Sequence, residues 1–341
     1  MQKPMKYKRV LFVGITVVTV TVILLFLRAP DRQPLEINEN VAGIIPQEAN
    51  ERIWVKEPLK KLFTAPVTLY DPGPMKLFNG NLYISDIGDL QIKKLSLDGK
   101  LINTIGNGSG RGPGELSMLT NFTKEKNIVW IFDHRTRTVS KFYENGEFIE
   151  SLIVKAPIGI MAMGDSLIFK NPLSETPFII YGTDGIEKSS FGSFVANQTD
   201  HPLAIDGKFY KKDKDLYYLP YYASYLIRFN KELTPTLLQL IDKTSFPSTS
   251  DVKKPSRQVQ MFAPNPEIKM SDLSIEGDTA SVLSQHRKKD QIEKRIDQYL
   301  LPDGLYMKSF SVPSTTQEAI VNEGRVYTLT DTSLVVYKLE L

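Results

Sequence analysis

The pattern of apolar and polar residues separates one long apolar segment from a body of short strands. Residues 10–27 form an uncharged run of 18 residues, VLFVGITVVTVTVILLFL. As a helix this run is about 27 Å long, close to the thickness of the bilayer's hydrocarbon core. Four basic residues precede it: Lys3, Lys6, Lys8 and Arg9. The pattern predicts a transmembrane signal anchor at residues 10–27, with residues 1–9 in the cytoplasm and the rest outside.

The alternative for this segment is a signal peptide that is removed. Its apolar region is usually shorter, about 7–15 residues, and ends at a pair of small residues. Here the run ends in Leu-Phe-Leu before Arg28, without such a pair. The sequence therefore favours the anchor.

After a polar segment at residues 28–50, which we expect to be a tether, the chain shows short β-rich runs and no amphipathic helix. The clearest units of three strands cover residues 81–105 and 127–153. Weaker copies follow at residues 165–185, 215–230, 278–304 and 324–339. Repeats of about 40–50 residues, each made of strands and a hairpin, are typical of a β-propeller.

Two pairs of residues put the first two units in register. Asp86 and Asp133 are 47 residues apart, and so are Gly99 and Gly146. The Asp-Gly and Asn-Gly turns favour tight two-residue hairpins, in which both central residues take positive φ.

The last unit stops after its third strand and so leaves an unpaired edge, which must find a partner. Residues 52–63 precede the first unit and belong to no unit of their own. The sequence therefore predicts an all-β fold over residues 51–341: a six-bladed β-propeller of four-stranded antiparallel blades, closed by an N-terminal strand.

A family resemblance rests on the first two units. The stretch GNGSGRGPGEL at residues 106–116, the strand ending in Phe132-Asp133, and the later Asn145-Gly146 turn resemble the NHL-type six-bladed β-propellers, especially uncharacterised envelope propellers of Bacteroidetes-like bacteria. The resemblance implies a fold and an envelope location but no reaction, because a fold alone does not determine chemistry. Those relatives are often lipoproteins, whereas this chain has no cysteine.

The irregular segments are predicted to share one face. In an antiparallel four-stranded blade the tight Gly turns lie on one side, and the other turns and the crossings between blades lie opposite. The irregular segments are residues 106–115, 133–137, 221–224, 242–267 and 285–294. Loops concentrated on one face favour a binding surface, although loops also lengthen wherever they cost little.

Seven residues in these loops are candidates for ligand contact: Arg111, Glu115, His134, Arg135, Tyr221, Tyr222 and Arg287. Basic side chains suit an anionic ligand, and tyrosines suit a peptide or glycan. Each also has a structural interpretation. Arg111 and Glu115 would pair across their loop, His134 would be solvated, and Arg287 would lie in a solvated hairpin tip.

Two carboxylates end the first strands of the first two units, which are the second strands of the predicted blades. Asp86 and Asp133 could hold Ca or Zn at the mouth of the channel. The sequence favours another role, in which each accepts hydrogen bonds from backbone N–H groups of the turn that follows its own strand.

Composition narrows the function classes. Among 341 residues there is no cysteine, which excludes disulfides, thiolate metal sites and a cysteine nucleophile. Five of the 42 basic residues flank the apolar run, leaving 37 against 39 acidic residues, so the formal charge of +3 does not indicate nucleic-acid binding. The run Gly106-x-Gly108 is not a nucleotide fingerprint, because no helix can begin after it.

These observations predict a membrane-anchored extracytoplasmic module, attached to the cytoplasmic membrane by residues 10–27, that binds a protein, peptide or glycan without a cofactor. The rival is a metal-dependent propeller hydrolase or lyase, similar to lactonases, with a site at the channel mouth. The sequence leaves open whether the chain is an enzyme.

Overall fold

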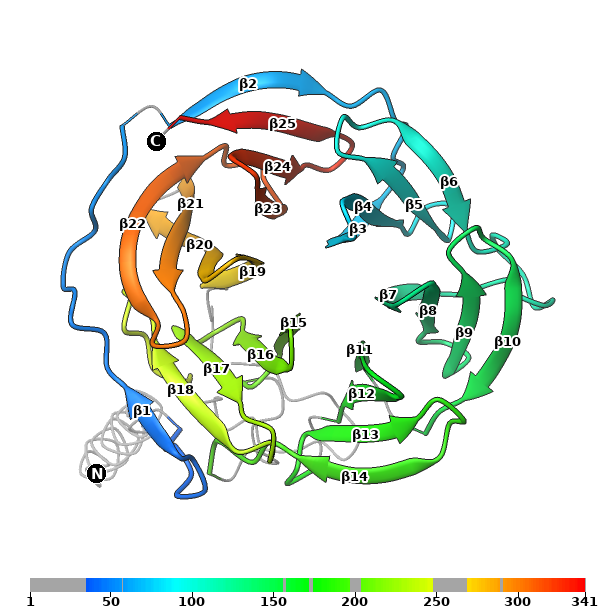
Figure 1. Ribbon diagram of the computed structural model, residues 1–341, viewed down its shortest axis with the longest axis horizontal. Coiled ribbons are helices and arrows are strands. Elements are labelled where there is room, and N and C mark those ends of the chain that lie inside the picture. Colours follow the sequence, from blue (N-terminus) through cyan, green and yellow to red (C-terminus); the bar gives the residue numbers. More distant parts are fainter. Residues whose placement is uncertain are drawn as a thin grey trace, which may run out of the picture.

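The protein is described by a computed structural model. The described residues are 35–56, 58–155, 158–171, 174–196, 204–247, 269–288 and 291–340. They form six sheets arranged in a ring around a central axis (Figure 1). In every sheet the four or three strands that follow one another in the chain run from the innermost outward, and β1 and β2 are added on the outside of two of the sheets. The predicted six-bladed, all-β propeller is confirmed.

The strands of the first three blades follow chain order. Blade 1 contains β3 (Pro72–Phe78), β4 (Asn81–Asp86), β5 (Gln91–Ser96) and β6 (Leu101–Ile105). Blade 2 contains β7 (Leu119–Glu125), β8 (Ile128–Asp133), β9 (Thr138–Tyr143) and β10 (Phe148–Ile153). Blade 3 contains β11 (Ile158–Met163), β12 (Ser166–Lys170), β13 (Phe178–Gly182) and β14 (Glu187–Phe191).

Of the other three blades, blades 4 and 6 each include one strand from the N-terminal part of the chain. Blade 4 contains β15 (Gly207–Lys212), β16 (Asp215–Pro220), β17 (Tyr225–Phe229) and β18 (Pro235–Gln239), with β1 (Gly43–Ile45) on its outer edge. Blade 5 contains β19 (Met270–Glu276), β20 (Thr279–Lys288), β21 (Gln291–Leu300) and β22 (Leu305–Val312). Blade 6 contains β23 (Glu318–Asn322), β24 (Arg325–Leu329), β25 (Leu334–Leu339) and, outermost, β2 (Leu59–Thr64).

Strand β2 closes the ring. It pairs antiparallel with β25, with Lys61 opposite Tyr337, and so covers the edge that the last unit leaves unpaired. The prediction that residues 52–63 complete the last blade is thus confirmed for the part that forms β2.

The chain before β2 lies along the outside of blades 4 and 5 (Figure 1). We call residues 35–55 the strap. Its strand β1 runs parallel to β18, with Ile44 opposite Leu237. Farther along, Val55 N donates to Ser309 O at 2.9 Å, and Ser309 N donates to Ile53 O at 2.8 Å. The part of the expected tether that the structure describes, residues 35–50, is therefore attached to the propeller along its length.

A cluster of ion pairs fastens the strap to blade 5. Arg52 Nε lies 3.0 Å from Asp297 Oδ1, and its NH2 lies 2.8 Å from Asp242 Oδ1. Arg295 reaches Asp242 at 3.0 Å, and Ser284 Oγ donates to Asp297 Oδ2 at 2.6 Å. Asp297 is fully buried, so its charge depends on these partners.

The hydrophobic core lies between neighbouring blades, because alternate residues of each strand face the adjacent sheet. Between blades 3 and 4, the ring of Phe178 packs against those of Phe209, Tyr218 and Phe229 at centroid distances of 4.6, 4.8 and 5.8 Å. Similar clusters join the other blades, which fixes where each innermost strand stands around the axis.

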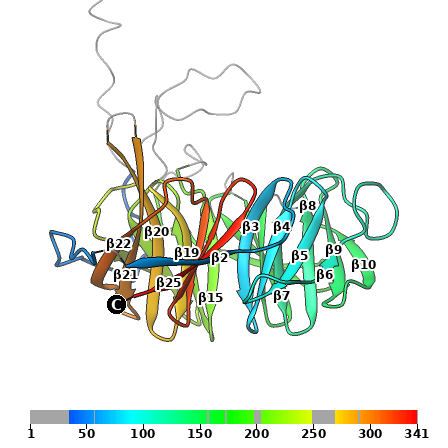
Figure 2. The same cartoon turned by 90° about the horizontal axis from the view of Figure 1, so that it is seen from above.

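The two faces differ as predicted, although the tight turns have a different geometry. Gly99, Gly146 and Gly185 take positive φ of 78°, 95° and 78°, whereas the residue before each glycine does not. The ladder shifts register beside each turn, so these are three-residue hairpins with a bulge at the glycine. On the opposite face the long hairpin of β20 and β21 extends beyond the body of the propeller (Figure 2).

Within the part of the chain that the structure describes, no helix could span a bilayer. The predicted anchor at residues 10–27 lies outside the described residues and stays a prediction.

The strap predicts a stability effect. Arg52→Met removes a cation from buried Asp297, and we expect the free energy of unfolding to fall by about 3 kcal/mol, because one partner of a buried pair is lost. Urea unfolding of the purified protein measures this change. Lys61→Met, at an exposed position of β2, is the matched control and should change stability by less than about 0.5 kcal/mol. Equal stability of the two variants would contradict the role of the cluster.

Candidate functional site

Four of the predicted contact residues lie together on the loop-rich face of blade 2. Arg111 and Glu115 lie in the crossing from β6 to β7, and His134 and Arg135 follow β8. The two segments are joined because His134 N donates to Met118 O at 3.1 Å. All four residues are exposed.

The expected pairing of Arg111 with Glu115 is not among the ion pairs of the described residues. The Glu115 carboxylate instead accepts a hydrogen bond from Gly112 N at 2.6 Å, so it shapes its own loop. That loop leaves little room for side chains, since a Cβ on Gly110 would lie 1.9 Å from Glu115 Oε2. Glu115 is therefore a structural residue of the crossing, and Arg111 is exposed beside it.

The remaining candidates lie on other blades. Tyr221 and Tyr222 follow β16, half-buried, with ring centroids 6.4 Å apart and planes at 89°. Burial raises the pKa of Tyr221 well above its ordinary value. Arg287 lies near the tip of the protruding β20–β21 hairpin. The structure thus distributes the seven candidates over three sectors of the same face rather than gathering them into one site.

The carboxylates of Asp86 and Asp133 are engaged by the protein itself. Asp86 accepts from Tyr70 N at 3.0 Å and from Asp71 N at 2.9 Å, and it binds Lys93 Nζ at 2.5 Å. These partners outweigh the effect of its burial and hold its pKa below the ordinary value.

Asp133 makes a similar set of bonds. It accepts from Ser117 N at 2.5 Å and from Arg135 N at 2.9 Å. Asp133 thus accepts from the turn that follows its strand, as the sequence predicted, whereas the backbone donors to Asp86 lie in the connection before β3 and not in the turn after β4. Among the described residues no cluster of three or more acidic or histidine side chains could hold a metal ion.

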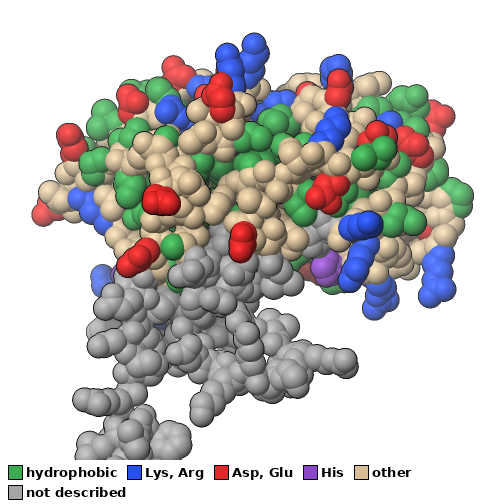
Figure 3. Space-filling model, turned by 90° about the horizontal axis from the view of Figure 1, so that it is seen from below, with side chains coloured by type: hydrophobic (Ala, Val, Ile, Leu, Met, Phe, Trp, Pro, Cys, Tyr) green, Lys and Arg blue, Asp and Glu red, His purple; other side chains and the backbone are tan. Residues whose placement is uncertain are grey.

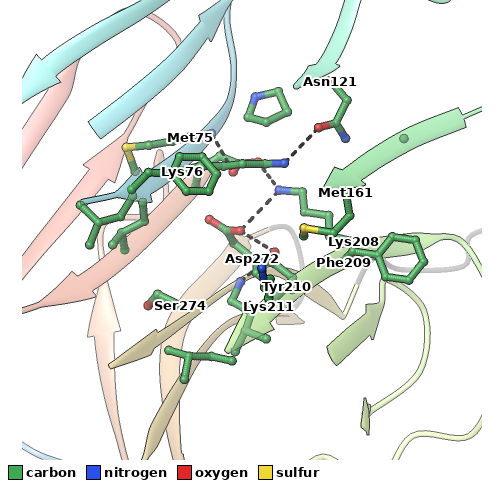
Figure 4. Close-up of a pocket in the computed structure, with 18 of the residues that line it drawn as sticks. Met75, Lys76, Asn121, Met161, Lys208, Phe209, Tyr210, Lys211, Asp272 and Ser274 are labelled. Carbon is green, nitrogen blue, oxygen red and sulfur yellow. Dashed lines mark hydrogen bonds and ion pairs between the residues drawn. The ribbon is translucent and has the colours of Figure 1, made fainter. Parts of the chain in front are cut away.

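A cavity of about 180 Å³ lies in the central channel, lined by the innermost strands of all six blades. Four polar side chains form one wall: Lys208 and Tyr210 of β15, Asp272 of β19 and Glu318 of β23 (Figure 4). Lys208 Nζ binds Glu318 Oε1 and lies 3.5 Å from Asp272 Oδ1, while Tyr210 OH donates to Asp272 at 2.7 Å. On this wall one ammonium is shared by two carboxylates.

Burial and neighbouring charges shift the pKa values of Glu318 and Lys208 on this wall. Burial and the neighbouring charge of Asp272 raise the pKa of the Glu318 carboxyl above its usual range. The two carboxylates outweigh the burial of Lys208 and raise the pKa of its ammonium.

Lys76 of β3 faces the same cavity from blade 1 (Figure 4). Its Nζ donates to Asn121 Oδ1 at 3.2 Å and to Phe122 O at 2.5 Å, and lies 5.1 Å from the centroid of the Phe122 ring. Burial, followed by the charge of Lys208, lowers the pKa of Lys76 from 10.5 to about 7. The cavity thus holds an amine that is partly neutral at physiological pH.

Sequence reasoning missed this cavity because it began each unit at the second strand of a blade. The innermost strands carry polar residues at positions that a purely structural strand would fill with apolar ones, such as Lys76, Asn121 and Asp272. The spacing of 47 residues between the first two units also separates residues that are bonded across the channel wall. Asp272 of β19 accepts a hydrogen bond at 3.0 Å from Ala319 N of β23, which is 47 residues away.

Comparison with known proteins supports the fold and nothing finer. No protein-family model matches the chain, and no curated protein matches its sequence. A Bacteroides fragilis protein named as exported superposes with a TM-score of 0.55 at 13% identity, covering 87% of this chain and all of that one.

Virginiamycin B lyase from Staphylococcus aureus has a TM-score of 0.50 at 11% identity, covering 82% of this chain and 99% of that one. Its catalytically inactive variant, solved with quinupristin, has a TM-score of 0.51. At such identities the likeness concerns the propeller alone.

The lowered pKa of Lys76 predicts how stability depends on pH. Between about pH 7 and 10.5 the unfolded chain binds a proton at this position that the folded chain does not, so raising the pH through this window favours folding. Relative to Lys76→Met, the wild type should therefore gain stability across the window by at most about 1.4 kcal/mol per pH unit. Urea unfolding at several pH values measures the difference.

Lys61→Met, at an exposed site on β2, is the matched control and should track the wild type through the same window. A constant difference between wild type and Lys76→Met from pH 7 to 10.5 would refute the assignment.

Proposed function

We propose that this protein is an extracytoplasmic binding module, anchored in the cytoplasmic membrane by residues 10–27, whose loop-rich face binds a protein, peptide or glycan. One observation carries the proposal. The turns on one face are tight hairpins, whereas the crossings between blades, the turns after β8 and β16, and the protruding β20–β21 hairpin all lie on the other. Binding residues concentrate on such irregular loops held by a rigid scaffold.

The side chains of this face also suit a macromolecular ligand. Tyr70, in the connection before β3, is 67% exposed, and Lys93 Nζ lies 5.0 Å from its ring centroid. Met118, next to the segment that carries His134, is 44% exposed. Exposed aromatic side chains provide large rigid contact area, and a flexible thioether side chain adapts to the shape of its partner. Together with Arg111 and Arg135 they form a mixed apolar and basic surface on blades 1 and 2.

The outer side of the propeller has no surface of one sign in the view of Figure 3. Basic and acidic side chains are interspersed there, with apolar groups between them. A strongly charged polymer would be expected to select a surface of one sign, so this side gives no support for such a ligand.

The rival function, a metal-dependent hydrolase or lyase, draws less support from the site. It would use Asp86 and Asp133 at the channel mouth, and both carboxylates already accept backbone hydrogen bonds. The structural likeness to virginiamycin B lyase concerns the propeller fold. The binding function is therefore the one that we retain.

The proposed location can be tested because the chain has no cysteine. Lys100→Cys places a single thiol on the propeller, at a side chain that is 77% exposed. We expect a membrane-impermeant maleimide to label it in cells whose outer membrane alone is permeabilised. Lys3→Cys, in the predicted cytoplasmic tail, should react only after lysis. Labelling of both variants only after lysis would overturn the extracytoplasmic location.

The binding face is tested by charge reversal. Arg111→Glu combined with Arg135→Glu should reduce crosslinking to envelope components in living cells by about tenfold, because two exposed cations on one corner of the face are inverted. The matched control, Lys100→Glu with Lys126→Glu, inverts two exposed cations on the face with tight turns. Loss of the same crosslinks in the control, or in neither variant, would contradict the assignment of the face.

A further inference from the structure

The central cavity is large enough for more than water. A cavity needs about 10–15 Å³ to hold one water molecule, and this one has about 180 Å³. Every blade contributes to its wall through its innermost strand. Because the blades are fixed by the cores between them, the wall is pre-formed and does not require a lid to be assembled.

The two walls of the cavity differ in how well their polar groups are satisfied. On one wall, Lys208 is paired with Glu318 and Asp272. Asp272 also accepts from Ala319 N, and Glu318 accepts from Met75 N at 3.3 Å. The hydrogen-bonding groups of this wall are therefore engaged by one another and by the backbone, and one ammonium lies between two carboxylates.

On the side of the cavity formed by Lys76 and Asn121, some hydrogen-bond donors have no acceptor among the described residues. Lys76 Nζ donates to two neutral oxygens, and no carboxylate of the described residues lies within 4.0 Å of it. An ammonium has three donors, so one is unused. The orientation of the Asn121 amide is determined by its neighbours, since Oδ1 accepts from both Lys76 Nζ and Phe122 N, the latter at 2.8 Å. Its Nδ2 has no acceptor in the part of the chain described.

We infer that the channel binds a small organic carboxylate, with one oxygen on Lys76 Nζ and the other on Asn121 Nδ2. Two adjacent donors match the two oxygens of a carboxylate, and a charge-assisted hydrogen bond is stronger in a buried site than in water. Lys76 is the ammonium of this wall group that has no carboxylate of the described residues within 4.0 Å, and a carboxylate ligand carries only one negative charge. Inorganic phosphate carries more charge, which the carboxylates of Asp272 and Glu318 in the same cavity would repel. This site is independent of the loop-rich face.

The pKa of Lys76 can be used to detect whether a carboxylate is bound beside it. Because burial lowers the pKa of Lys76 to about 7, a bound anion should raise it again. Competitive acylation with acetic anhydride, read residue by residue by mass spectrometry, gives the pH midpoint of Lys76 labelling in the intact protein. Sodium acetate is the probe, compared with sodium phosphate and sodium chloride at equal ionic strength.

We expect acetate to raise the labelling midpoint by at least one pH unit, which slows acylation of Lys76 about tenfold below the midpoint. Phosphate and chloride should leave it unchanged. An unchanged midpoint in acetate, or an equal shift in phosphate or chloride, overturns the proposal.

Two substitutions of lining lysines provide an independent readout. Acetate should raise the melting temperature of the wild type and of Lys211→Met, whose lysine is already paired with Glu125 at 2.7 Å. It should not raise that of Lys76→Met, because ligand stabilisation requires the binding group. Circular dichroism establishes that both variants are folded. Stabilisation of Lys76→Met equal to that of Lys211→Met also overturns the site.

Discussion

The architecture depends on one pairing, that of β2 with β25. With only β23, β24 and β25, the last blade would leave the outer edge of β25 unpaired. The N-terminal strand β2 pairs with this edge. Closure also determines the geometry of the channel. Glu318 on blade 6 can meet Lys208 of blade 4 and Met75 of blade 1 only because blade 6 is held in place in the ring.

The channel wall shows how a propeller satisfies the inner edges of its blades. The innermost strand of each blade presents N–H groups that no further strand can pair. Between blades 5 and 6, Asp272 and Ser274 of β19 accept hydrogen bonds from the backbone of β23 at 3.0 and 2.9 Å, and Glu276 accepts from Glu323 N, just after β23, at 2.7 Å. Polar residues on these strands therefore bond neighbouring blades to one another. Lys76 does so through Phe122 O and has a further donor that a ligand could use.

Much of the fold could be predicted from the sequence, and little of the channel could. The turn glycines and the 47-residue register are local signals, and they predicted the blades and their closure. The role of Asp133 was predictable because it ends a strand beside a turn, whereas the donors to Asp86 come from the connection before β3. Lys76 and Asn121 are neighbours only across the gap between blades 1 and 2, and the partners of Lys208 come from two other blades. Such contacts arise from ring geometry, which no short stretch of sequence encodes.

The route of the strap has a mechanical consequence. The chain reaches β2 only after running over blades 4 and 5, held by β1, by the backbone of Ser309 and by Arg52. Tension applied upstream of residue 35 would have to peel these attachments one after another before any load reached the closing strand. The strap would thus bear a pulling force first, and β2 would stay paired with β25 until the strap had been released.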